Sequence, residues 1–444
     1  MNIFYFEGAA GTGKTYSLIH SLKDYLREHA LAEHQRVLAL TFMHGSRKRL
    51  EIKLNNINDI KKKFDCVTFD SFAWEIVQRW DGLLSKYSVD DFIIKNPYDK
   101  VCAQASILLA LPSVQKWISR TYPVVLIDEV QDLSKPRFEI LKGLSEYCTL
   151  FVAGDAFQVL QENVDSLDFL KWLKDNSKYV FLSEVKRTDD NGILTVSSNL
   201  RSGNDFLGSL KEYRWGRCLG NFKLVIVPKW HLMSWQIGFD FHRYKYRQIA
   251  ILVLSHSESI VEKAITRVRT ETQKIKDNTF GPFPNIVKII NDEEYAQKCM
   301  LEIDMNESQY EYDEVIKKCE NISDQTVAVA LQNWLRKRKR IGYSLCDEKG
   351  MYDKVLNIYR NQRIYRRTKE DKQQVLTIHQ AKNREFEHVI IPWTFGMAAN
   401  ASDDYKRRLL YNAITRAVKS CTVILMREDR LMTAPFTNSY RGAQ

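Results

Sequence analysis

A short glycine-rich segment near the N-terminus contains the residue types that can hold a phosphate group. It has the spacing G-x-x-x-x-G-K-[ST], and its eight residues are Gly8, Ala9, Ala10, Gly11, Thr12, Gly13, Lys14 and Thr15. Glycines allow backbone N–H groups to turn inward around a phosphate, and the lysine reaches the outer phosphates. The hydroxyl after the lysine can ligate Mg²⁺. The segment therefore predicts a site for ATP and Mg²⁺.

A pair of acids supplies the second half of such a site. Residues 123–127 (PVVLI) predict a buried strand, and Asp128 and Glu129 follow it directly. An acid at the tip of a parallel strand beside a phosphate loop holds Mg²⁺. We therefore expect Asp128 to ligate the metal together with Thr15, and Glu129 to orient and deprotonate the attacking water. The alternative is an acidic helix start, because the N-terminal end of a helix favours negative side chains.

A third strand tip adds a weaker signal. The apolar residues 148–153 lead into Gly154 and Asp155, and Gln158 follows. A polar side chain at such a tip can sense the γ-phosphate of ATP. A loop glutamine after a Gly-Asp turn is common by itself. We therefore interpret Gln158 as a γ-phosphate sensor only because the glycine loop and the acid pair are also present.

These residues need elements that position them. Residues 2–6 (NIFYF) predict a buried strand before the glycine loop, and residues 16–27 carry apolar side chains at helical spacing after it. Strand, glycine loop and helix in this order are the context that the phosphate pattern requires. A chain of 444 residues suggests two to four domains.

The composition is that of a globular protein with a formal net charge of +11. Basic residues cluster at 47–49, 61–63, 336–340 and 360–367, the last with tyrosines between them. Basic groups with interleaved aromatics suit a nucleic-acid backbone and its bases, although each cluster alone can be a solvated helix face.

Cysteine usage and hydropathy exclude other classes. The eight cysteines are scattered without a CxxC pair, so we expect buried free thiols rather than a zinc site. No apolar run approaches the roughly 20 residues needed to cross a bilayer, and the N-terminus has no signal pattern. We expect a cytoplasmic protein with no membrane partner.

In their order along the chain, these segments resemble the motifs of UvrD/Rep-like superfamily 1 helicases. The residues that carry the resemblance are 40–42 (LTF), 68–72 (TFDSF), 128–132 (DEVQD), 154–158 (GDAFQ), 377–386 (TIHQAKNREF) and 407–417 (RRLLYNAITRA). The last segment is the closest match. It also predicts an amphipathic helix, whose Leu409, Leu410, Ala413 and Ile414 face a core.

The resemblance implies an α/β fold: two RecA-like P-loop NTPase domains with parallel sheets flanked by helices, plus short helical insertions. The first motor domain would span residues 1–190, with a short helical insertion at about 75–120. The second would combine residues 191–254 with 371–444. Residues 255–370 would form a helical, basic insertion between those two parts.

The resemblance also implies roles for individual residues. Arg187 and Arg416 would be the two arginines that stabilise the γ-phosphate in the transition state, and Glu385 would reach the ribose. The implied DNA-contacting residues are Thr41, Phe42, Thr68, Ser71, Phe72, Thr377 and His379. To these we add Arg336, Lys337 and Arg338 of the basic insertion.

The chain departs from the family pattern in four places. It begins only seven residues before Gly8, which leaves no room for an adenine-reading glutamine, and Lys186 replaces the tyrosine that stacks on the base. Residues 159–163 (VLQEN) lack the aromatics that stack on DNA bases. Asn383 replaces a glycine, and asparagine tolerates a left-handed backbone better than most residues. Base selectivity and the grip on DNA are therefore open.

The implied function is a DNA-stimulated ATPase that moves on single-stranded DNA, 3′ to 5′, and unwinds it as a helicase. The alternative is a DNA-end- or single-strand-sensing ATPase that activates a partner nuclease, of the OLD type, as in Gabija-type anti-phage systems. A third hypothesis, a P-loop kinase for a small molecule, leaves the C-terminal motifs and the basic clusters unexplained.

Overall fold

The computed structural model of the chain describes residues 2–42, 44–84, 97–160, 165–244, 248–256, 258–275, 278–288, 292–304, 310–342, 345–366, 373–394, 401–426, 431 and 433–437. The chain forms two compact units. The larger one comprises Met1–Phe283 and Thr377–Gln444, and the smaller one comprises Pro284–Leu376.

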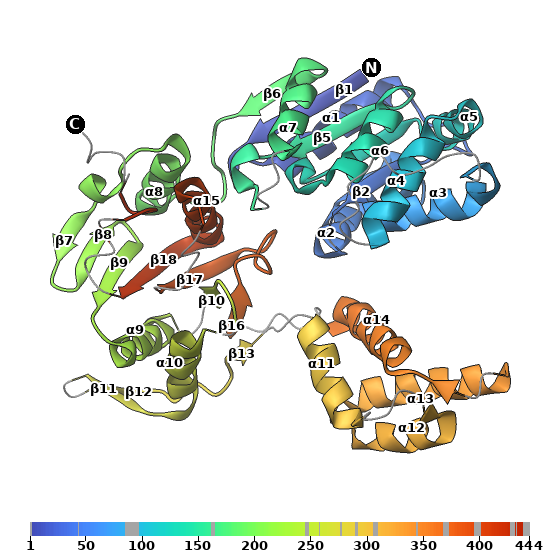
Figure 1. Cartoon of the computed structure of the whole chain (residues 1–444). Coiled ribbons are helices and arrows are strands. Elements are labelled where there is room, and N and C mark those ends of the chain that lie inside the picture. The colour runs from blue at the N-terminus through green and yellow to red at the C-terminus, as the bar shows by residue number, and fades with distance from the viewer. Residues whose placement is uncertain are drawn as a thin grey trace. The chain divides into compact units, whose positions relative to one another are not determined.

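A six-stranded parallel sheet forms the first part of the larger unit, with the strand order β3-β2-β4-β5-β1-β6 (Figure 1). The strands are β1 (Asn2–Gly8), β2 (Val37–Thr41), β3 (Phe64–Thr68), β4 (Val124–Ile127), β5 (Thr149–Gly154) and β6 (Lys178–Leu182). Because all of them run in the same direction, their carboxyl ends lie along one edge of the sheet. That edge receives the glycine loop and both predicted acids.

Helices cover both faces of this sheet at its strands β2, β4 and β5, whose residues are all buried. Val124 and Leu126 of β4 pack in one core with α1 and α2, whereas Val125 and Ile127 pack in the opposite core with α3 to α7. The helices are α1 (Lys14–Glu28), α2 (His44–Asn55), α3 (Phe69–Leu84), α4 (Pro97–Leu109), α5 (Pro112–Thr121), α6 (Lys135–Ser145) and α7 (Asp165–Asp175). Short 3₁₀ turns are η1 (Asn58–Ile60), η2 (Val130–Asp132) and η3 (Ala156–Gln158).

A second sheet follows, with the order β13-β16-β10-β17-β18-β9-β8-β7. Its central pairs are parallel, and the hairpin strands β7 and β8 are antiparallel additions at one edge. The strands are β7 (Lys211–Tyr213), β8 (Gly216–Leu219), β9 (Phe222–Val227), β10 (Ile249–Val253), β13 (Val287–Lys288), β16 (Gln373–Thr377), β17 (Phe386–Trp393) and β18 (Ala417–Met426). The associated helices are α8 (Asn191–Ser202), η4 (Leu207–Ser209), α9 (Trp230–Arg243), α10 (Ser259–Thr270) and α15 (Asp403–Ile414).

The mixed α/β fold with a parallel P-loop sheet and a second sheet domain confirms the predicted fold class. The compact units do not separate the two sheets, so the boundary near residue 190 stays a prediction. Of the insertion at about 75–120, residues 85–96 lie outside the described residues. In the described part, α4 and α5 contribute Cys102, Val114 and Ile118 to the core of the first sheet.

The smaller unit has its own helical core. Its elements are α11 (Asp292–Ile303), β14 (Tyr310–Glu311), α12 (Tyr312–Lys318), η5 (Cys319–Asn321), α13 (Gln325–Arg340), β15 (Leu345–Cys346) and α14 (Glu348–Arg366). The sequence places the insertion at 255–370, whereas the compact unit begins at Pro284. The difference arises because α10 packs against α9, and the hairpin of β11 (Gln273–Ile275) and β12 (Asn278–Phe280) also belongs to the larger unit.

Within the described ranges, no single helix has the length and apolar composition needed to cross a membrane. One pair of helices, Tyr98–Leu109 and Pro112–Thr121, meets those criteria only when taken together across a bend of 94°.

Candidate active site

The glycine loop connects β1 to the first turn of α1, as the sequence predicts. Gly11 and Gly13 both have a φ of 83°, a left-handed conformation that glycine adopts without strain. A Cβ on Gly11 would also lie 2.6 Å from Cβ of Arg187. The loop and the segment that carries Arg187 are therefore in direct contact, and the backbone N–H of Lys186 donates to the carbonyl oxygen of Gly11 at 2.7 Å.

Lys14 is buried, and its ammonium group is directed into the loop. Its Nζ donates to the carbonyl oxygens of Gly8 at 3.0 Å and Ala9 at 3.1 Å. These two carbonyls hold the ammonium where the backbone wraps around a phosphate. Binding of a phosphate would exchange two neutral acceptors for charged oxygens, which form stronger hydrogen bonds with an ammonium group.

Thr15 and Asp128 lie together as a magnesium site requires. The hydroxyl of Thr15 donates to Oδ2 of Asp128 at 3.0 Å. Burial and the neighbouring Glu129 raise the pKa of Asp128 to about 6, although Thr15 and Lys14 oppose the shift. A half-buried hydroxyl oxygen and a buried carboxylate beside each other fit a hard divalent cation.

Glu129 has a backbone conformation that is unusual for its type, with φ 59° and ψ 44°. Oε2 of Glu129 accepts a hydrogen bond of 2.6 Å from Nε2 of Gln131. Burial would raise the pKa of this carboxyl, but Lys14, Gln131 and more distant cations together lower it. Glu129 is therefore held as a carboxylate, which is the form that accepts a proton from water.

Gln158 and Asp155 lie at the end of β5, on the same edge of the sheet. Gln158 is buried in the 3₁₀ turn that follows Asp155. Asp155 is fully buried, accepts a hydrogen bond from the N–H of Phe157 at 3.1 Å, and forms a 2.6 Å ion pair with Arg201. The role of Gln158 as a sensor of the γ-phosphate stays a prediction.

Arg187 connects the phosphate loop with the second sheet. Its Nε donates to Oε1 of Glu385 at 2.9 Å, and its Nη1 donates to the carbonyl oxygen of Thr415 at 2.8 Å. Glu385 is half exposed. The residue expected at the γ-phosphate and the residue expected at the ribose are thus paired with each other.

Arg416 follows α15 and is only 2% exposed. Its guanidinium donates to the carbonyl oxygen of Asn412 at 3.0 Å and to Oγ1 of Thr415 at 3.2 Å. Burial and the positive charge of Arg187 lower its pKa to about 10, so it remains charged at neutral pH. Within the described part of the chain Arg416 forms no ion pair, which suits a group that would receive a phosphate.

Two further contacts join the second sheet domain to the nucleotide loop and the acidic box. Nζ of Lys382 donates to Oδ1 of Asp132 at 2.6 Å, with both side chains nearly buried. The hydroxyl of Tyr411 accepts a hydrogen bond of 2.9 Å from the N–H of Ala10. The sequence places Asp132, Lys382 and Tyr411 inside motifs but gives them no role.

Comparison with known families agrees with this geometry. Residues 2–163 match the family model of an AAA domain, and residues 374–424 match that of the UvrD-like helicase C-terminal domain. The chain is UvrD/Rep-like, with the domains of a superfamily 1 helicase. These domains are those of an ATP-hydrolysing, helicase-type enzyme. No curated protein matches the chain.

The residues that the UvrD/Rep resemblance assigns to DNA have different environments in the first sheet. Ser71 is exposed, and its hydroxyl is 2.8 Å from that of Thr68, which lies at the end of β3. Phe42 is partly buried beneath the guanidinium of Arg137, 5.6 Å from its ring centroid. In contrast, Thr41 is fully buried and Phe72 is 2% exposed within the core. Both side chains are packed inside the protein in this structure, and the DNA contacts expected for them stay predictions.

The corresponding residues of the UvrD-like C-terminal domain form a turn after β16. The N–H of Thr377 donates to Oε1 of Gln380, and the N–H of Gln380 donates to the hydroxyl of Thr377. His379 lies within the turn that these two hydrogen bonds close, and it is exposed. Asn383 has a φ of 61°, the left-handed conformation that the sequence indicates for this position.

In the smaller unit of this UvrD/Rep-like chain, Arg336, Lys337 and Arg338 occupy the last turns of α13. Arg338 lies 5.6 Å from the ring of Trp334, and Arg336 and Lys337 are exposed. The basic group at 360–367 is not placed, because the side chains of 360–366 and all of Arg367 lie outside the described residues. The same holds for residues 161–163 of the non-aromatic stretch.

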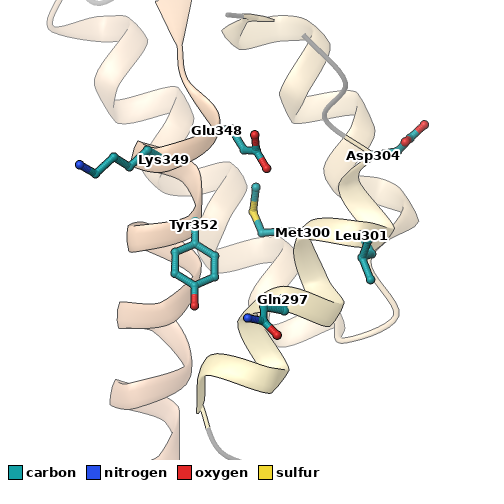
Figure 2. A pocket seen from close by; sticks show the side chains of 7 residues that line it. All are labelled: Gln297, Met300, Leu301, Asp304, Glu348, Lys349 and Tyr352. Atoms are coloured by element: carbon teal, nitrogen blue, oxygen red, sulfur yellow. The ribbon is translucent and has the colours of Figure 1, made fainter. Parts of the chain in front are cut away.

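A cavity of about 660 Å³ lies between α11 and α14 of the smaller unit (Figure 2). Its lining residues are Gln297, Met300, Leu301, Asp304, Glu348, Lys349 and Tyr352. None of them is among the residues that the sequence assigns to ATP or DNA.

Proposed function

We propose that this protein is an ATP-dependent DNA translocase and helicase, whose ATP hydrolysis is stimulated by single-stranded DNA. The supporting observation is the set of contacts at the phosphate loop and acidic box. Tyr411 and Lys382 of the second sheet domain bind Ala10 and Asp132 of the first. These contacts bring residues of both sheet domains to the phosphate loop and the acidic box, as a motor of this kind requires.

Hydrolysis in this site assigns one task to each group. Lys14 and the loop N–H groups bind the phosphates, and Glu129 accepts a proton from the attacking water. The water oxygen forms a bond to the γ-phosphorus, and the bond from that phosphorus to the oxygen bridging to ADP breaks. Arg187 and Arg416 stabilise the charge on the transferred phosphoryl group. Mg²⁺, held by Thr15 and Asp128, would supply Lewis-acid stabilisation of the phosphate oxygens.

Movement follows from a charge shared by the two domains. While the γ-phosphate is present, groups from the first domain and Arg416 of the second bind the same anion. Loss of phosphate after hydrolysis removes that shared ligand, and the two domains can separate. DNA across the ends of β2 and β3 and the turn with His379 would be gripped alternately. We propose movement 3′ to 5′, by resemblance to the family.

The test is ATP hydrolysis by the purified protein with single-stranded DNA, with single-stranded RNA and without nucleic acid. We expect a many-fold rise with DNA and no hydrolysis by Lys14→Ala. Duplexes with a 3′ or a 5′ single-stranded tail then report unwinding and direction. A rate that ignores nucleic acids of both kinds contradicts the proposal.

A second candidate is favoured by one specific feature. Residues 159–163 contain no aromatic side chain, and Val159 and Leu160 are buried. Stacking of a base on an aromatic ring contributes about 1–3 kcal/mol, so its loss weakens a stepping grip. In this alternative, ATP turnover reports a bound DNA end to a partner nuclease. DNA-stimulated hydrolysis without strand separation, together with nuclease activation, would favour it.

A further inference from the structure

Gln131 has a buried position between the proposed general base and the end of β5. The side chain is 2% exposed. Its Nε2 donates to Oε2 of Glu129 at 2.6 Å, and its Oε1 accepts a hydrogen bond of 3.0 Å from the N–H of Asp155. Both ends of the amide are therefore satisfied, one by a carboxylate and one by backbone. A buried amide held at both ends has little freedom to turn.

The position of the Gln131 amide depends on the absence of a side chain at Gly154. A Cβ at Gly154 would lie 2.6 Å from Cγ1 of Val130 and 3.1 Å from Oε1 of Gln131. Any larger residue would push the amide of Gln131 away from the N–H of Asp155. The glycine thus allows close approach between β5 and the turn that carries Glu129.

Asp155 continues the chain of contacts towards the second sheet domain. Its N–H binds Gln131, and its carboxylate accepts from Arg201 at 2.6 Å and from the hydroxyl of Tyr411 at 3.5 Å. The ring of Tyr411 also packs edge-on against Phe157, with centroids 5.0 Å apart. Tyr411 is 1% exposed and belongs to α15, the helix that leads to Arg416.

Tyr411 makes a further contact with the phosphate loop. Its hydroxyl accepts from the N–H of Ala10 at 2.9 Å. A continuous set of hydrogen bonds therefore runs from Ala10 through Tyr411, Asp155 and Gln131 to Glu129. It connects the loop that binds phosphate, the helix that precedes Arg416 and the carboxylate that activates water.

We infer that Gln131 and Tyr411 are positioning residues for ATP hydrolysis, which act on Glu129 through this one hydrogen-bonded chain. The inference rests on the hydrolysis proposed above. Gln131 holds Glu129 in the orientation in which it faces the attacking water. Tyr411 transmits the position of α15 to Gln131 through Asp155. A shift of the second domain against the phosphate loop therefore changes the orientation of the general base.

The experiment is a double-mutant cycle with Gln131→Met and Tyr411→Phe, measured as kcat and KM for ATP at saturating DNA. Methionine fills the space of glutamine without its hydrogen bonds, and phenylalanine keeps the ring on Phe157. Loss of a hydrogen bond to a charged group corresponds to about 10- to 100-fold, so we expect kcat of Gln131→Met to fall by that factor. We expect a roughly threefold to tenfold fall for Tyr411→Phe, because its bonds are weaker. KM should change by less than about threefold in either variant.

The double-mutant cycle decides whether the two residues act through one series of hydrogen bonds or have two separate structural effects. If they act through one series, kcat of the double variant equals that of Gln131→Met within about twofold. Gln131→Met should also leave the residual rate of Glu129→Gln unchanged, because the group it positions is gone. The inference is overturned if the factors by which kcat falls multiply in the double variant, or multiply when Gln131→Met is combined with Glu129→Gln. A rise of KM as large as the fall of kcat also overturns it.

Matched substitutions elsewhere in the larger unit control for packing. Gln236 is a buried glutamine whose Nε2 donates to Asp240 at 3.1 Å, and Tyr122 is a buried tyrosine whose hydroxyl donates to Asp65 at 2.9 Å. Gln236→Met and Tyr122→Phe should keep kcat within twofold. A wild type without Lys14-dependent hydrolysis would overturn the proposed function and this inference together, whereas an active wild type with multiplying losses overturns the inference alone.

Discussion

Arg187 and Glu385 form an ion pair in which Nε and Oε1 are 2.9 Å apart, although they are 198 positions apart in the sequence. By resemblance to the family, one would bind the γ-phosphate and the other the ribose of the same nucleotide. In the structure each is the partner of the other. On those assignments ATP competes with Glu385 for Arg187, whereas ADP, which has no γ-phosphate, does not bind Arg187.

This competition predicts a change in nucleotide preference for Glu385→Gln. The substitution removes the negative charge but keeps a group that can contact the ribose. Because an ion pair as exposed as this one contributes at most about 1 kcal/mol, we expect affinity for a non-hydrolysable ATP analogue to rise up to about fivefold relative to ADP. Calorimetric titration of both nucleotides measures it. An equal change for both would show that the pair does not compete with the γ-phosphate, and Arg187→Ala should abolish the preference.

Arg416→Met is expected to separate stability from activity. Burial and the charge of Arg187 lower the pKa of Arg416, so the folded, nucleotide-free protein disfavours its charged form. Methionine carries no charge, so this cost of burying a charge disappears and the melting temperature without nucleotide should rise. Hydrolysis should fall by about 10³-fold or more, as for other arginines that contact a transferred phosphoryl group. Scanning calorimetry and steady-state kinetics test both parts. A melting temperature that falls while hydrolysis persists would contradict them.

The Lys382–Asp132 pair should hold the acidic box against the second domain. Lys382→Met leaves Asp132 buried without its counter-charge, and breaking such a pair costs about 3–5 kcal/mol. The double variant with Asp132→Asn should recover most of that loss, because no charge is then left uncompensated. Urea unfolding of the wild type, both single variants and the double variant gives the comparison. If Lys382→Met and the double variant are equally unstable, the pair does not act as a unit.

The raised pKa of Asp128 predicts a pH-dependent stability without Mg²⁺. Its pKa of about 6 exceeds the ordinary value of 3.8 by about two units, so the folded state binds a proton more tightly than the unfolded state does. The free energy of unfolding therefore falls as pH rises from 4 to 6, and above pH 6 the total loss is about 3 kcal/mol. Asp128→Asn should be more stable than the wild type at pH 7.5 in EDTA, by up to that amount.

The advantage of Asp128→Asn should shrink towards pH 4, where the wild-type carboxyl is protonated. Saturating Mg²⁺ should stabilise the wild type and leave the variant unchanged. Unfolding by urea at several pH values, with EDTA or Mg²⁺, measures both effects. A difference that stays constant from pH 4 to pH 7.5 would show that the Asp128 carboxyl does not titrate in this range.

The sequence alone indicates those parts of the site that are local. Lys14 and Thr15 follow the glycines within one loop, and Asp128 and Glu129 follow one apolar segment, so residue order is enough to predict their roles. Phe72 shows the limit of such reasoning. It lies in a motif assigned to DNA, but helical spacing from Phe69 and Ile76 turns it into the core.

Contacts between segments that are far apart in the sequence could not be predicted from it. Ala10 and Tyr411 are separated by 401 positions, and nothing in either segment specifies which loop N–H the tyrosine will bind. Gln131 stands between two recognised acids, yet its hydrogen bond to Asp155 depends on the pairing of β4 with β5 and on the space left by Gly154. Such relationships arise from packing, not from residue order.

The left-handed backbone of Glu129 has a consequence for engineering. A residue with a side chain is strained at a φ of 59°, by about 1 kcal/mol or more, and glycine is not. Glycine at this position would relieve that strain, but it would also remove the carboxylate that accepts the hydrogen bond of Gln131 and that we propose as the general base. Any search for more stable variants therefore has to monitor turnover in parallel, because relief of backbone strain at position 129 and retention of its carboxylate exclude each other.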